Sequence, residues 1–386
     1  MSKPILKSFA QSGISIITPD GKTHELGSVL ANPIEPITVK DWGFFWDLVS
    51  GYDLGFAEGY LNGRWDHNNL PRLFQHLSTL TSQGLASAIG VYAPSKIAAR
   101  ITQHVKSKNS LKSAKKNISD HYDLSNDFFE SFLDNSMTYS CGIFEDNENS
   151  LDVAQQTKIN HLLNAAGVRS EQSILDIGCG WGSLALSAAT NYSLNVSAVT
   201  LSKNQFDSFN KRIGDNNLTH VIDLKRMDYR MMEGKFDHIF SVEMLEAVGH
   251  NGVDTFFEKC SNLIRTNGSL QIQVIVVPDD RYDTYRKNCD YIQKYIFPGG
   301  LLLSERLLNN SAAKYGFEIY RSEEIGHHYA KTLASWRTNL ESNWPAVKQL
   351  GFKERDFRKF FYYFSYCEGA FQSGHINTLQ ISYRKQ

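Results

Sequence analysis

Short apolar runs recur along the second half of the chain, each bounded by polar or glycine-containing segments. Runs of this length are typical of strands in a sheet that is buried on both faces. The segments between them have helical spacing, notably Val253–Ile264, Tyr282–Ile296 and Glu354–Phe371. The alternation predicts an α/β fold with an open, doubly wound sheet. The expected strands are Ser173–Ile177, Val196–Leu201, Val221–Met227, His238–Val242, Leu270–Val277, Phe317–Ile325 and Asn377–Tyr383.

The first 95 residues follow a different pattern. Ile14–Thr18 alternates weakly and leads into the turn Pro19–Lys22, whose Asp-Gly pair tolerates positive φ. From Asp41 to Leu80 the spacing becomes helical and rich in aromatic residues, without a cluster of acid–base groups. We therefore expect a smaller, mainly helical accessory domain at 1–95, for lipid binding or dimerisation, and a larger domain at 121–386.

A basic segment separates the two expected domains. Residues 96–120 form a linker in this division, and 95–117 contain lysine and arginine but no acidic residue. A solvated linker explains such a segment. A surface attracted to anionic lipid head groups explains it as well, at about 1 kcal/mol per basic residue near a membrane. The two interpretations are compatible.

Three alternating glycines follow the first strand of the larger domain. Ser173–Ile177 is apolar, Gly178, Gly180 and Gly182 come next, and an alanine-rich helical segment begins at Leu184. Glycine allows a tight turn and a close approach of a ligand to the backbone. The dinucleotide fingerprint Gly-x-Gly-x-x-Gly is absent. A plain strand–helix turn remains possible, but Asp176 before the glycines favours a loop that binds S-adenosylmethionine.

Composition narrows the class of protein. With 386 residues and 41% hydrophobic residues, the chain is long enough for two domains with ample cores. A net charge of −1 argues against a nucleic-acid partner. Five cysteines without a Cys-x-x-Cys pair predict neither disulfides nor a metal site, and they fit a reducing cytoplasm. No apolar run reaches the ~20 residues of a membrane-spanning helix, and the N-terminus does not predict a signal peptide.

Eight separated blocks of sequence share one resemblance. They are His121–Phe129, Met137–Cys141, Leu175–Gly182, Val199–Gln205, Glu243–His250, Tyr295–Gly300, His328–Leu333 and Cys367–Phe371. Together they resemble the cyclopropane-fatty-acyl-phospholipid synthases and mycolic acid cyclopropane synthases. The resemblance implies a seven-stranded class I methyltransferase sheet. It also implies methyl transfer from S-adenosylmethionine to the double bond of an unsaturated acyl chain, followed by proton loss from a carbocation and ring closure.

The resemblance implies a set of cofactor-binding residues. Asp176 and the glycines are expected to approach the methionine and ribose parts, and Asp228 to accept from the adenine amine. Ser202 and Asp228 have an alternative interpretation as helix caps or turn residues. The full set is Tyr139, Ser140, Asp176, Gly178, Gly180, Gly182, Thr200, Ser202, Gln205 and Asp228.

The resemblance also implies how the proton is removed. Family members hold a bicarbonate ion, and the matching positions here are Cys141, Glu246, Gln273, Tyr329 and the backbone of Ile275. We expect Glu246 to be the principal catalytic residue, because a carboxylate in an apolar site must be hydrogen-bonded or protonated. Capping of a nearby helix is a different explanation for Glu246.

Three further points concern the candidate catalytic residues. Cys367 matches another family cysteine, although core packing explains it equally well. Cys141 alone reads as a small buried hydrophobe, and Tyr329 alone as a half-buried tyrosine. Gln273 and Ala247 stand where family members usually carry histidine, and glutamine cannot titrate near neutrality.

Several functions therefore remain open within and outside this family. A different fate of the cation would give a methylene- or methyl-branched acyl chain instead of a ring. Outside the family, an N- or O-methyltransferase of a small metabolite and a non-catalytic lipid-binding protein also fit the cofactor loop. The expected partners are unsaturated phospholipid acyl chains, reached from the cytoplasm by peripheral contact with the inner face of the membrane. A homodimer is expected only by analogy.

Overall fold

A computed structural model describes residues 13–25, 34–82, 125–146 and 150–386. The chain divides into two compact units, each built from three separate stretches of sequence. Unit 1 comprises Met1–His104, Lys287–Ile296 and Leu333–His375, and unit 2 comprises Val105–Arg286, Phe297–Thr332 and Ile376–Gln386. The basic segment 95–117 lies outside the described residues.

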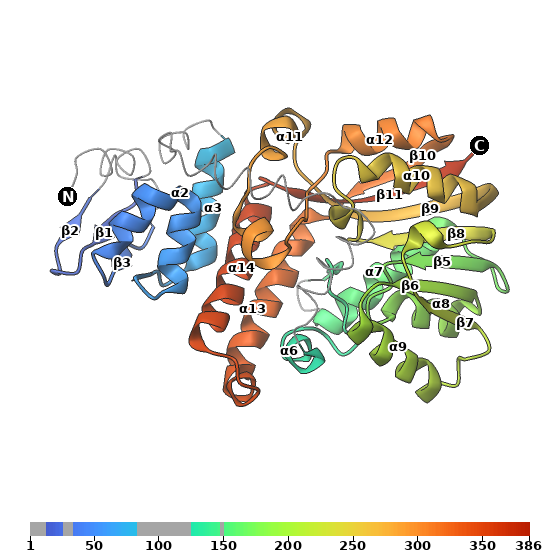
Figure 1. Cartoon of the computed structure of the whole chain (residues 1–386), viewed down its shortest axis with the longest axis horizontal. Coiled ribbons are helices and arrows are strands. Elements are labelled where there is room, and N and C mark those ends of the chain that lie inside the picture. The colour runs from blue at the N-terminus through green and yellow to red at the C-terminus, as the bar shows by residue number, and fades with distance from the viewer. Residues whose placement is uncertain (1–12, 26–33, 83–124, 147–149) are drawn as a thin grey trace. The chain divides into compact units, whose positions relative to one another are not determined.

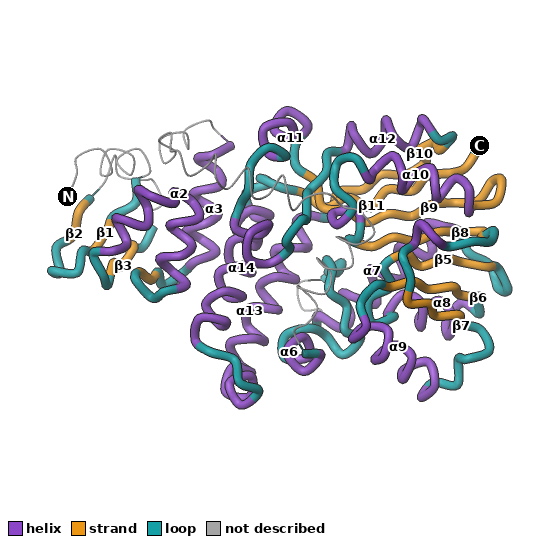
Figure 2. Tube along the Cα trace, viewed as in Figure 1, coloured by secondary structure: helices purple, strands orange, loops and turns teal. Residues whose placement is uncertain are grey.

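Unit 2 is built around a seven-stranded sheet with the strand order β10-β11-β9-β8-β5-β6-β7 (Figures 1 and 2). The strands from β9 to β7 run parallel, and β11 lies antiparallel between β10 and β9. The α/β fold class with a seven-stranded sheet is therefore confirmed. The strands are β5 (Ser173–Ile177), β6 (Asn195–Thr200), β7 (Ile222–Arg226), β8 (Phe236–Val242), β9 (Ile264–Val276), β10 (Phe317–Glu324) and β11 (Asn377–Lys385).

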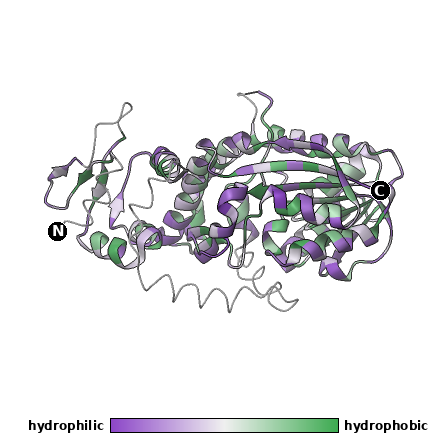
Figure 3. Ribbon diagram, turned by 90° about the horizontal axis from the view of Figure 1, so that it is seen from above, coloured by the Kyte–Doolittle hydropathy of each residue, from purple (hydrophilic) through white to green (hydrophobic). Residues whose placement is uncertain are grey.

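Helices cover both faces of this sheet. Alternate residues of β5 point to opposite sides, so that Leu175 and Ile177 join one buried cluster and Ile174 joins the other. The first cluster is closed by α10 (Gly252–Leu263) and α12 (Glu305–Lys314). The second is closed by α7 (Leu151–Ala166), α8 (Ser183–Tyr192) and α9 (Lys203–Asp215). In Figure 3, hydrophobic and hydrophilic residues alternate along the strands and helices of this unit.

One predicted helix is wrong. The sequence pattern suggested a single helix over Tyr282–Ile296, but α11 ends at Tyr285 and a separate π-helical turn occupies Ile292–Ile296. Asp290 explains why the π-helical turn begins separately, because its Oδ1 accepts a hydrogen bond of 2.8 Å from the backbone N–H of Gln293. An aspartate that satisfies a free backbone donor in this way begins a new turn.

Unit 1 combines helices with a small sheet of order β2-β1-β3-β4. The helix α14 (Glu354–Gln372) packs on α2 (Gly43–Leu61) and on α3 (Leu70–Ser82). Its Gly369 permits a close approach, because a Cβ there would lie 2.5 Å from the backbone nitrogen of Gln75. The strands are β1 (Ile16–Ile17), β2 (Thr23–His24), β3 (Ile37–Val39) and β4 (Trp65–Asp66).

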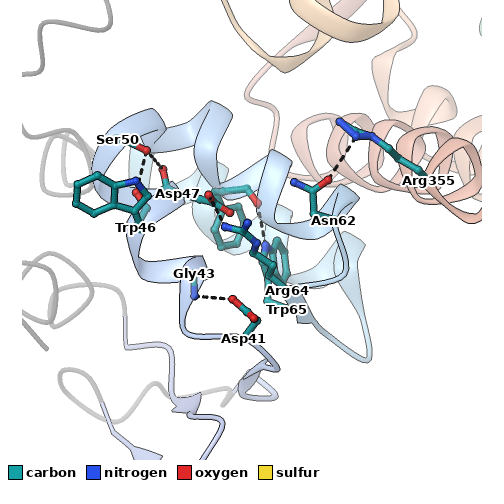
Figure 4. Close-up of polar contacts among 10 residues, drawn as sticks. Asp41, Gly43, Trp46, Asp47, Ser50, Asn62, Arg64, Trp65 and Arg355 are labelled. Atoms are coloured by element: carbon teal, nitrogen blue, oxygen red, sulfur yellow. Dashed lines mark hydrogen bonds and ion pairs between the residues drawn. The ribbon is translucent and has the colours of Figure 1, made fainter.

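Polar contacts hold α2 to the chain around it (Figure 4). The guanidinium of Arg64 pairs with Asp47 at 2.7 Å, and the indole N–H of Trp65 donates to the carbonyl of Phe56 at 2.8 Å. Asn62, just after α2, accepts from Arg355 of α14 at 3.4 Å. Within the described residues of either unit, every helix falls short of the length and apolarity needed to cross a bilayer.

Candidate active site

The glycine turn after β5 has the geometry of a ligand-binding loop. Gly178, Gly180 and Gly182 have φ values of 82°, 56° and 89°, a region that other residues occupy only with strain. A Cβ on Gly182 would lie 2.1 Å from the ring of Phe209, so this glycine is required for packing. A Cβ on Gly180 would meet no atom within 4 Å. Gly180 is therefore the point of the turn that a ligand can approach.

Asp176 lies just before the turn and is almost completely buried. Its Oδ2 atom makes no hydrogen bond with the described residues. Burial raises the pKa of this carboxyl to about 7, although the positive charge of Lys158 partly offsets the effect. A buried carboxylate oxygen without a partner at the carboxyl end of a parallel strand suits a cationic group such as the ammonium of S-adenosylmethionine. The residues present therefore fit this cofactor.

The titration of Asp176 gives a testable pH dependence of cofactor binding. Below pH 7 Asp176 is protonated and offers no charge to an ammonium group, whereas above pH 7 it is ionised. We expect the affinity for S-adenosylhomocysteine to rise by up to about tenfold per pH unit as the pH approaches 7 from below, and then to level off. Isothermal titration calorimetry across this pH range measures the slope.

Two variants separate Asp176 from other carboxylates. Asp176→Asn should bind more weakly and lose the slope, whereas Asp207→Asn, which alters an exposed aspartate on α9, should keep it. A slope that persists in Asp176→Asn would show that a different group titrates.

The polar residues after β6 and β7 hold the local structure of this sheet edge. Thr200 Oγ1 donates to Gln205 Oε1 at 2.8 Å. Ser202 caps α9 by accepting from the backbone N–H of Gln205. Asp228 caps the short helix at Tyr229–Met231 and pairs with Arg230 at 2.6 Å. The helix-cap interpretation is thus confirmed for Ser202 and Asp228, and the cofactor-binding role of Thr200, Ser202, Gln205 and Asp228 stays a prediction.

The contacts of Asp228 with Arg230 determine its ionisation state. Burial alone would raise the pKa of the carboxyl, but the hydrogen bonds and charge of Arg230 outweigh burial and hold it below its usual range. Asp228 is therefore ionised at neutral pH and can accept hydrogen bonds only.

The segment after β8 touches the glycine turn. A Cβ on Gly178 would lie 2.7 Å from Cγ of Met244, so the turn packs directly against this side chain. Met244 stands between Glu243 and Glu246, which are both buried carboxylates. The cofactor loop and two buried carboxyl groups therefore occupy one neighbourhood at the carboxyl edge of the sheet.

Glu243 is the most extensively bonded carboxylate of this site. Its Oε1 accepts from the backbone N–H of Cys141 at 2.9 Å and from Nε2 of Gln273 at 2.8 Å. Its Oε2 accepts from the hydroxyl of Tyr329 at 2.6 Å. The sequence prediction missed Glu243, although its place directly after a parallel strand was a usable signal.

Glu246 lies near Glu243 but has fewer partners. Its Oε1 accepts from the backbone N–H of Ile275 at 2.6 Å, and its Oε2 makes no hydrogen bond with the described residues. Burial raises the pKa of Glu246 to about 8, and the charge of Glu243 adds to the shift. Glu246 therefore carries a proton at neutral pH, and its contacts are not those of a helix cap.

Cys141 and Gln273 are fixed in forms that cannot exchange protons. Burial, and then the charge of Glu243, raise the pKa of the Cys141 thiol well above its usual value, so the thiol stays protonated. Gln273 donates from Nε2 to the carbonyl of Cys141 at 3.2 Å as well as to Glu243. Its Oε1 accepts from Gln380 at 2.8 Å, which sets the amide orientation. Both residues position Glu243.

Lys158 on α7 is a second residue that the sequence prediction missed. It is almost completely buried, and its ammonium group donates to Oγ of Ser140 at 2.7 Å. Burial lowers its pKa, whereas the charges of Glu243 and Asp176 act in the opposite direction. Lys158 thus lies within electrostatic reach of both the carboxyl of Asp176 before the glycine turn and that of Glu243. The position of Lys158 in the sequence does not indicate a functional role, because it falls among the buried, mostly apolar residues of α7.

Aromatic rings adjoin the glycine turn. Tyr139 packs against Phe129 and Phe297 with ring centroids 5.5 and 6.1 Å apart. Phe129 in turn lies 5.0 Å from Trp181, which belongs to the glycine turn. Rings arranged in this way exclude water and stabilise a nearby cation through their faces.

Cys367 belongs to the other compact unit. It lies on α14 of unit 1, where burial and the charge of Asp290 raise the pKa of its thiol. Cys367 is only partly buried, and its catalytic role stays a prediction. No group of three His, Cys, Asp or Glu side chains is arranged for a metal ion within the described ranges.

Comparisons with known proteins bear on this site. A model of the mycolic acid cyclopropane synthetase family matches residues 109–381, which contain every candidate site residue named above. The chain is 34% identical over 335 residues to tuberculostearic acid methyltransferase UfaA1 of Mycobacterium tuberculosis, covering 85% of this chain and 78% of that protein. It is 32% identical over 352 residues to cyclopropane-fatty-acyl-phospholipid synthase of Escherichia coli K12, covering 90% of this chain and 87% of that protein.

A solved structure gives a similar match. Mycolic acid cyclopropane synthase CmaA1, complexed with SAH and CTAB, is 30% identical with a TM-score of 0.66. The match covers 70% of this chain and 98% of that one.

Proposed function

Because the chain belongs to the mycolic acid cyclopropane synthetase family of S-adenosylmethionine-dependent methyltransferases, we propose that it methylates the double bond of an unsaturated fatty acyl chain of a phospholipid and closes a cyclopropane ring. The observation that carries this proposal is the contact between Gly178 and Met244. It brings two buried carboxyl groups next to the cofactor turn, where a carbon acceptor needs a base. A nitrogen or oxygen acceptor attacks with a lone pair and leaves no carbocation that must lose a proton from carbon to close a ring.

Each group of residues has a distinct part in this reaction. When bound, S-adenosylmethionine supplies a methyl group on a positively charged sulfur. Asp176 holds the cationic end of the cofactor, and the glycine turn lets it approach the backbone. The rings of Phe129, Tyr139 and Phe297 keep water away from the cationic carbon that forms on the acyl chain. The buried carboxylates receive the proton that is lost as the ring closes.

A methylene- or methyl-branched product is the second candidate. The two relatives compared above have similar identities to this chain, and one is named a methyltransferase while the other is named a cyclopropane synthase. In addition, Gln273 replaces the histidine expected from the family and cannot titrate. The bicarbonate ion expected from the resemblance is not part of this proposal, because Glu243 already occupies the relevant donors.

One experiment tests the proposed function against these rival activities. The protein is incubated with methyl-labelled S-adenosylmethionine and vesicles of a monounsaturated phospholipid, and the acyl chains are analysed by mass spectrometry. We expect label in the chains with a ring at the former double bond. A labelled methylene or methyl branch would establish the second candidate. Label absent from the acyl chains would reject both and favour an N- or O-methyltransferase of a small metabolite.

Peripheral contact with the inner face of a membrane, from the cytoplasm, completes the proposal. Trp42, Trp46 and Val49 recur at helical spacing at the start of α2, and their exposed fractions are 51%, 72% and 42%. Exposed tryptophans suit the interface between water and lipid. The basic segment at 95–117 adds attraction to anionic head groups. A homodimer through the first domain is a further proposal by analogy only.

Membrane contact through these residues is testable in two variants. Replacing Trp42 and Trp46 together with serine should lower partitioning onto anionic vesicles about tenfold at any salt concentration, because apolar burial is lost. Neutralising Lys112, Lys115 and Lys116 with glutamine should weaken binding mainly at low salt. Vesicle co-sedimentation measures both effects.

The control for these variants is Leu350→Ser, which removes an exposed apolar side chain outside α2. It should bind vesicles like the wild type. Unchanged binding in both the tryptophan and the lysine variants would exclude these segments as the membrane contact.

A further inference from the structure

At the positions that the family resemblance assigns to bicarbonate, the backbone N–H, amide and hydroxyl donors reach carboxylates of the chain itself, whereas the thiol of Cys141 donates to the carbonyls of Gly142 and Ile325. The backbone N–H of Cys141 and the amide of Gln273 donate to Oε1 of Glu243, at 2.9 and 2.8 Å. The hydroxyl of Tyr329 donates to its Oε2 at 2.6 Å. The remaining donor, the backbone N–H of Ile275, is taken by Glu246 at 2.6 Å. Of the backbone N–H, amide and hydroxyl donors of this set, none is left to hold a separate ion in this arrangement.

We propose that the Glu243 carboxylate takes the place of a bicarbonate ion and is itself the proton acceptor, so that this enzyme needs no bicarbonate. The inference rests on the proposed function. A carboxylate presents two oxygens on a planar carbon, as bicarbonate does, and it accepts hydrogen bonds from the same donors. The difference is that Glu243 is covalently attached and always present.

The backbone at Glu243 supports a functional role. Its φ is 49°, a region in which a residue with a side chain is strained. The strained residue is held in place, because its own N–H donates to the carbonyl of Gln273 at 2.7 Å. Strain of this kind clusters at sites where a side chain must be aimed. Here it turns the side chain of Glu243 towards Cys141 and Tyr329.

The hydrogen bonds favour Glu243 over Glu246 as the member of the carboxylate pair that carries the negative charge. Burial raises the pKa of Glu243, and its three hydrogen bonds and the charge of Lys158 oppose this shift. Glu246 receives a single hydrogen bond from a backbone N–H, and burial and then the charge of Glu243 raise its pKa to about 8. The proposal therefore places the one proton of the pair on Glu246 and the negative charge on Glu243.

The proposed step balances without another reactant. The methyl group has formed a bond to one carbon of the former double bond, and the other carbon is cationic. A C–H bond of that methyl group breaks, its electron pair forms the third bond of the ring, and the proton goes to Oε2 of Glu243. This oxygen accepts from the hydroxyl of Tyr329 with one lone pair and offers the second to the proton. The proton leaves to water after product release.

The test compares turnover with and without bicarbonate. Wild-type protein is assayed with S-adenosylmethionine and monounsaturated phospholipid vesicles in carbon-dioxide-free buffer and in buffer with about 20 mM added bicarbonate, roughly the level at which a weakly held ion would saturate. We expect equal kcat in both. Glu243→Gln, which keeps the size of the side chain, should lose at least ~100-fold in kcat, as expected for a removed general base. Its affinity for S-adenosylhomocysteine should not change.

A second variant asks whether the ion can replace the side chain. Glu243→Gly removes the carboxylate and relieves the strained φ, and it should regain turnover when bicarbonate or acetate is added. Wild-type turnover that requires bicarbonate would overturn the inference. So would a kcat of Glu243→Gln near that of the wild type, or a folded, cofactor-binding Glu243→Gly that neither anion rescues. If the wild type transfers no methyl group to lipid at all, the proposed function fails instead.

Discussion

Glu246→Gln is expected to lower turnover by about 100-fold or more while leaving the affinity for S-adenosylhomocysteine unchanged. Glutamine keeps the acceptor for the backbone N–H of Ile275, and it is neutral, as Glu246 is at neutral pH. Local geometry and charge are therefore retained. The variant cannot take up or release a proton, and a carboxyl with a pKa of about 8 next to Glu243 is suited to pass one on. Single-turnover kinetics with labelled cofactor measures the loss.

The same variant should be at least as stable as the wild type, which distinguishes a catalytic role from a structural one. The pKa of Glu246 is raised from 4.5 to about 8 in the folded protein. As the pH rises through 4.5, the unfolded chain ionises this group while the folded protein keeps it protonated, so the free energy of unfolding of the wild type falls until about pH 8. Glu246→Gln lacks this loss. Within that pH window, its free energy of unfolding should therefore exceed that of the wild type by up to roughly 1.4 kcal/mol more with each pH unit.

Chemical denaturation near the two ends of this pH window supplies the stability measurement. Glu246→Ala is the informative contrast, because it removes the acceptor for Ile275 and leaves that buried N–H without a partner. It should be less stable than Glu246→Gln at both ends, because both variants lack the pH-dependent loss and only the alanine leaves the N–H of Ile275 unpaired. Wild-type turnover in Glu246→Gln would remove Glu246 from the mechanism and leave Glu243 as the single acid–base group of the pair.

The sheet could be predicted from the sequence because its strands obey a simple rule. Runs such as Ser173–Ile177 are apolar on both sides, and a parallel sheet covered by helices buries both faces. The helix over Tyr282–Ile296 could not be predicted in the same way. Its apolar spacing fits a helix, but Asp290 satisfies a backbone donor and starts a new turn. A local hydrogen bond thus overrides periodicity.

The division into units was also beyond the reach of local pattern. Residues 333–375 follow the strand β10 in sequence, and nothing in their composition separates them from the sheet. They belong to unit 1 because α14 presents Gly369 and aromatic residues to α3. Such packing depends on contacts between segments far apart in the chain, such as that of Arg355 with Asn62, which hydrophobic spacing along one helix does not encode.

The parts of the candidate site that consist of local sequence motifs could be predicted. The parts that depend on hydrogen bonds between residues far apart in the chain could not. The glycine turn and Asp176 are recognisable from their order after a strand. Glu243 and Lys158 were missed, since each acquires its role from partners far along the chain. Glu243 pairs with Cys141 and Tyr329, and Lys158 pairs with Ser140. Chemistry that depends on such pairings becomes visible only in three dimensions.

Substitution by alanine should have different effects at two glycines of the cofactor turn, lowering cofactor affinity at one and stability at the other. Gly180→Ala is expected to fold with nearly wild-type stability, because a Cβ at this position meets no atom within 4 Å. Its φ of 56° lies in the left-handed region, which costs alanine about 1 kcal/mol. The methyl group projects to the side from which a ligand approaches, so the affinity for S-adenosylhomocysteine should fall at least about tenfold, equivalent to roughly 1.4 kcal/mol.

Gly182→Ala is expected to lose stability. Its Cβ would lie 2.1 Å from the ring of Phe209, a completely buried residue of α9, and its φ is 89°. Crowding in a packed core costs about 1–3 kcal/mol, and the strained backbone adds about 1–2 kcal/mol. The double variant Gly182→Ala with Phe209→Leu should recover part of the loss, because the shorter side chain makes room for the methyl group. Thermal unfolding and calorimetric titration of the same samples separate the two effects. Equal stabilities of the two alanine variants would mean that Gly182 is not required for packing. Tight cofactor binding by Gly180→Ala would mean that the open side of the turn is not where the cofactor lies.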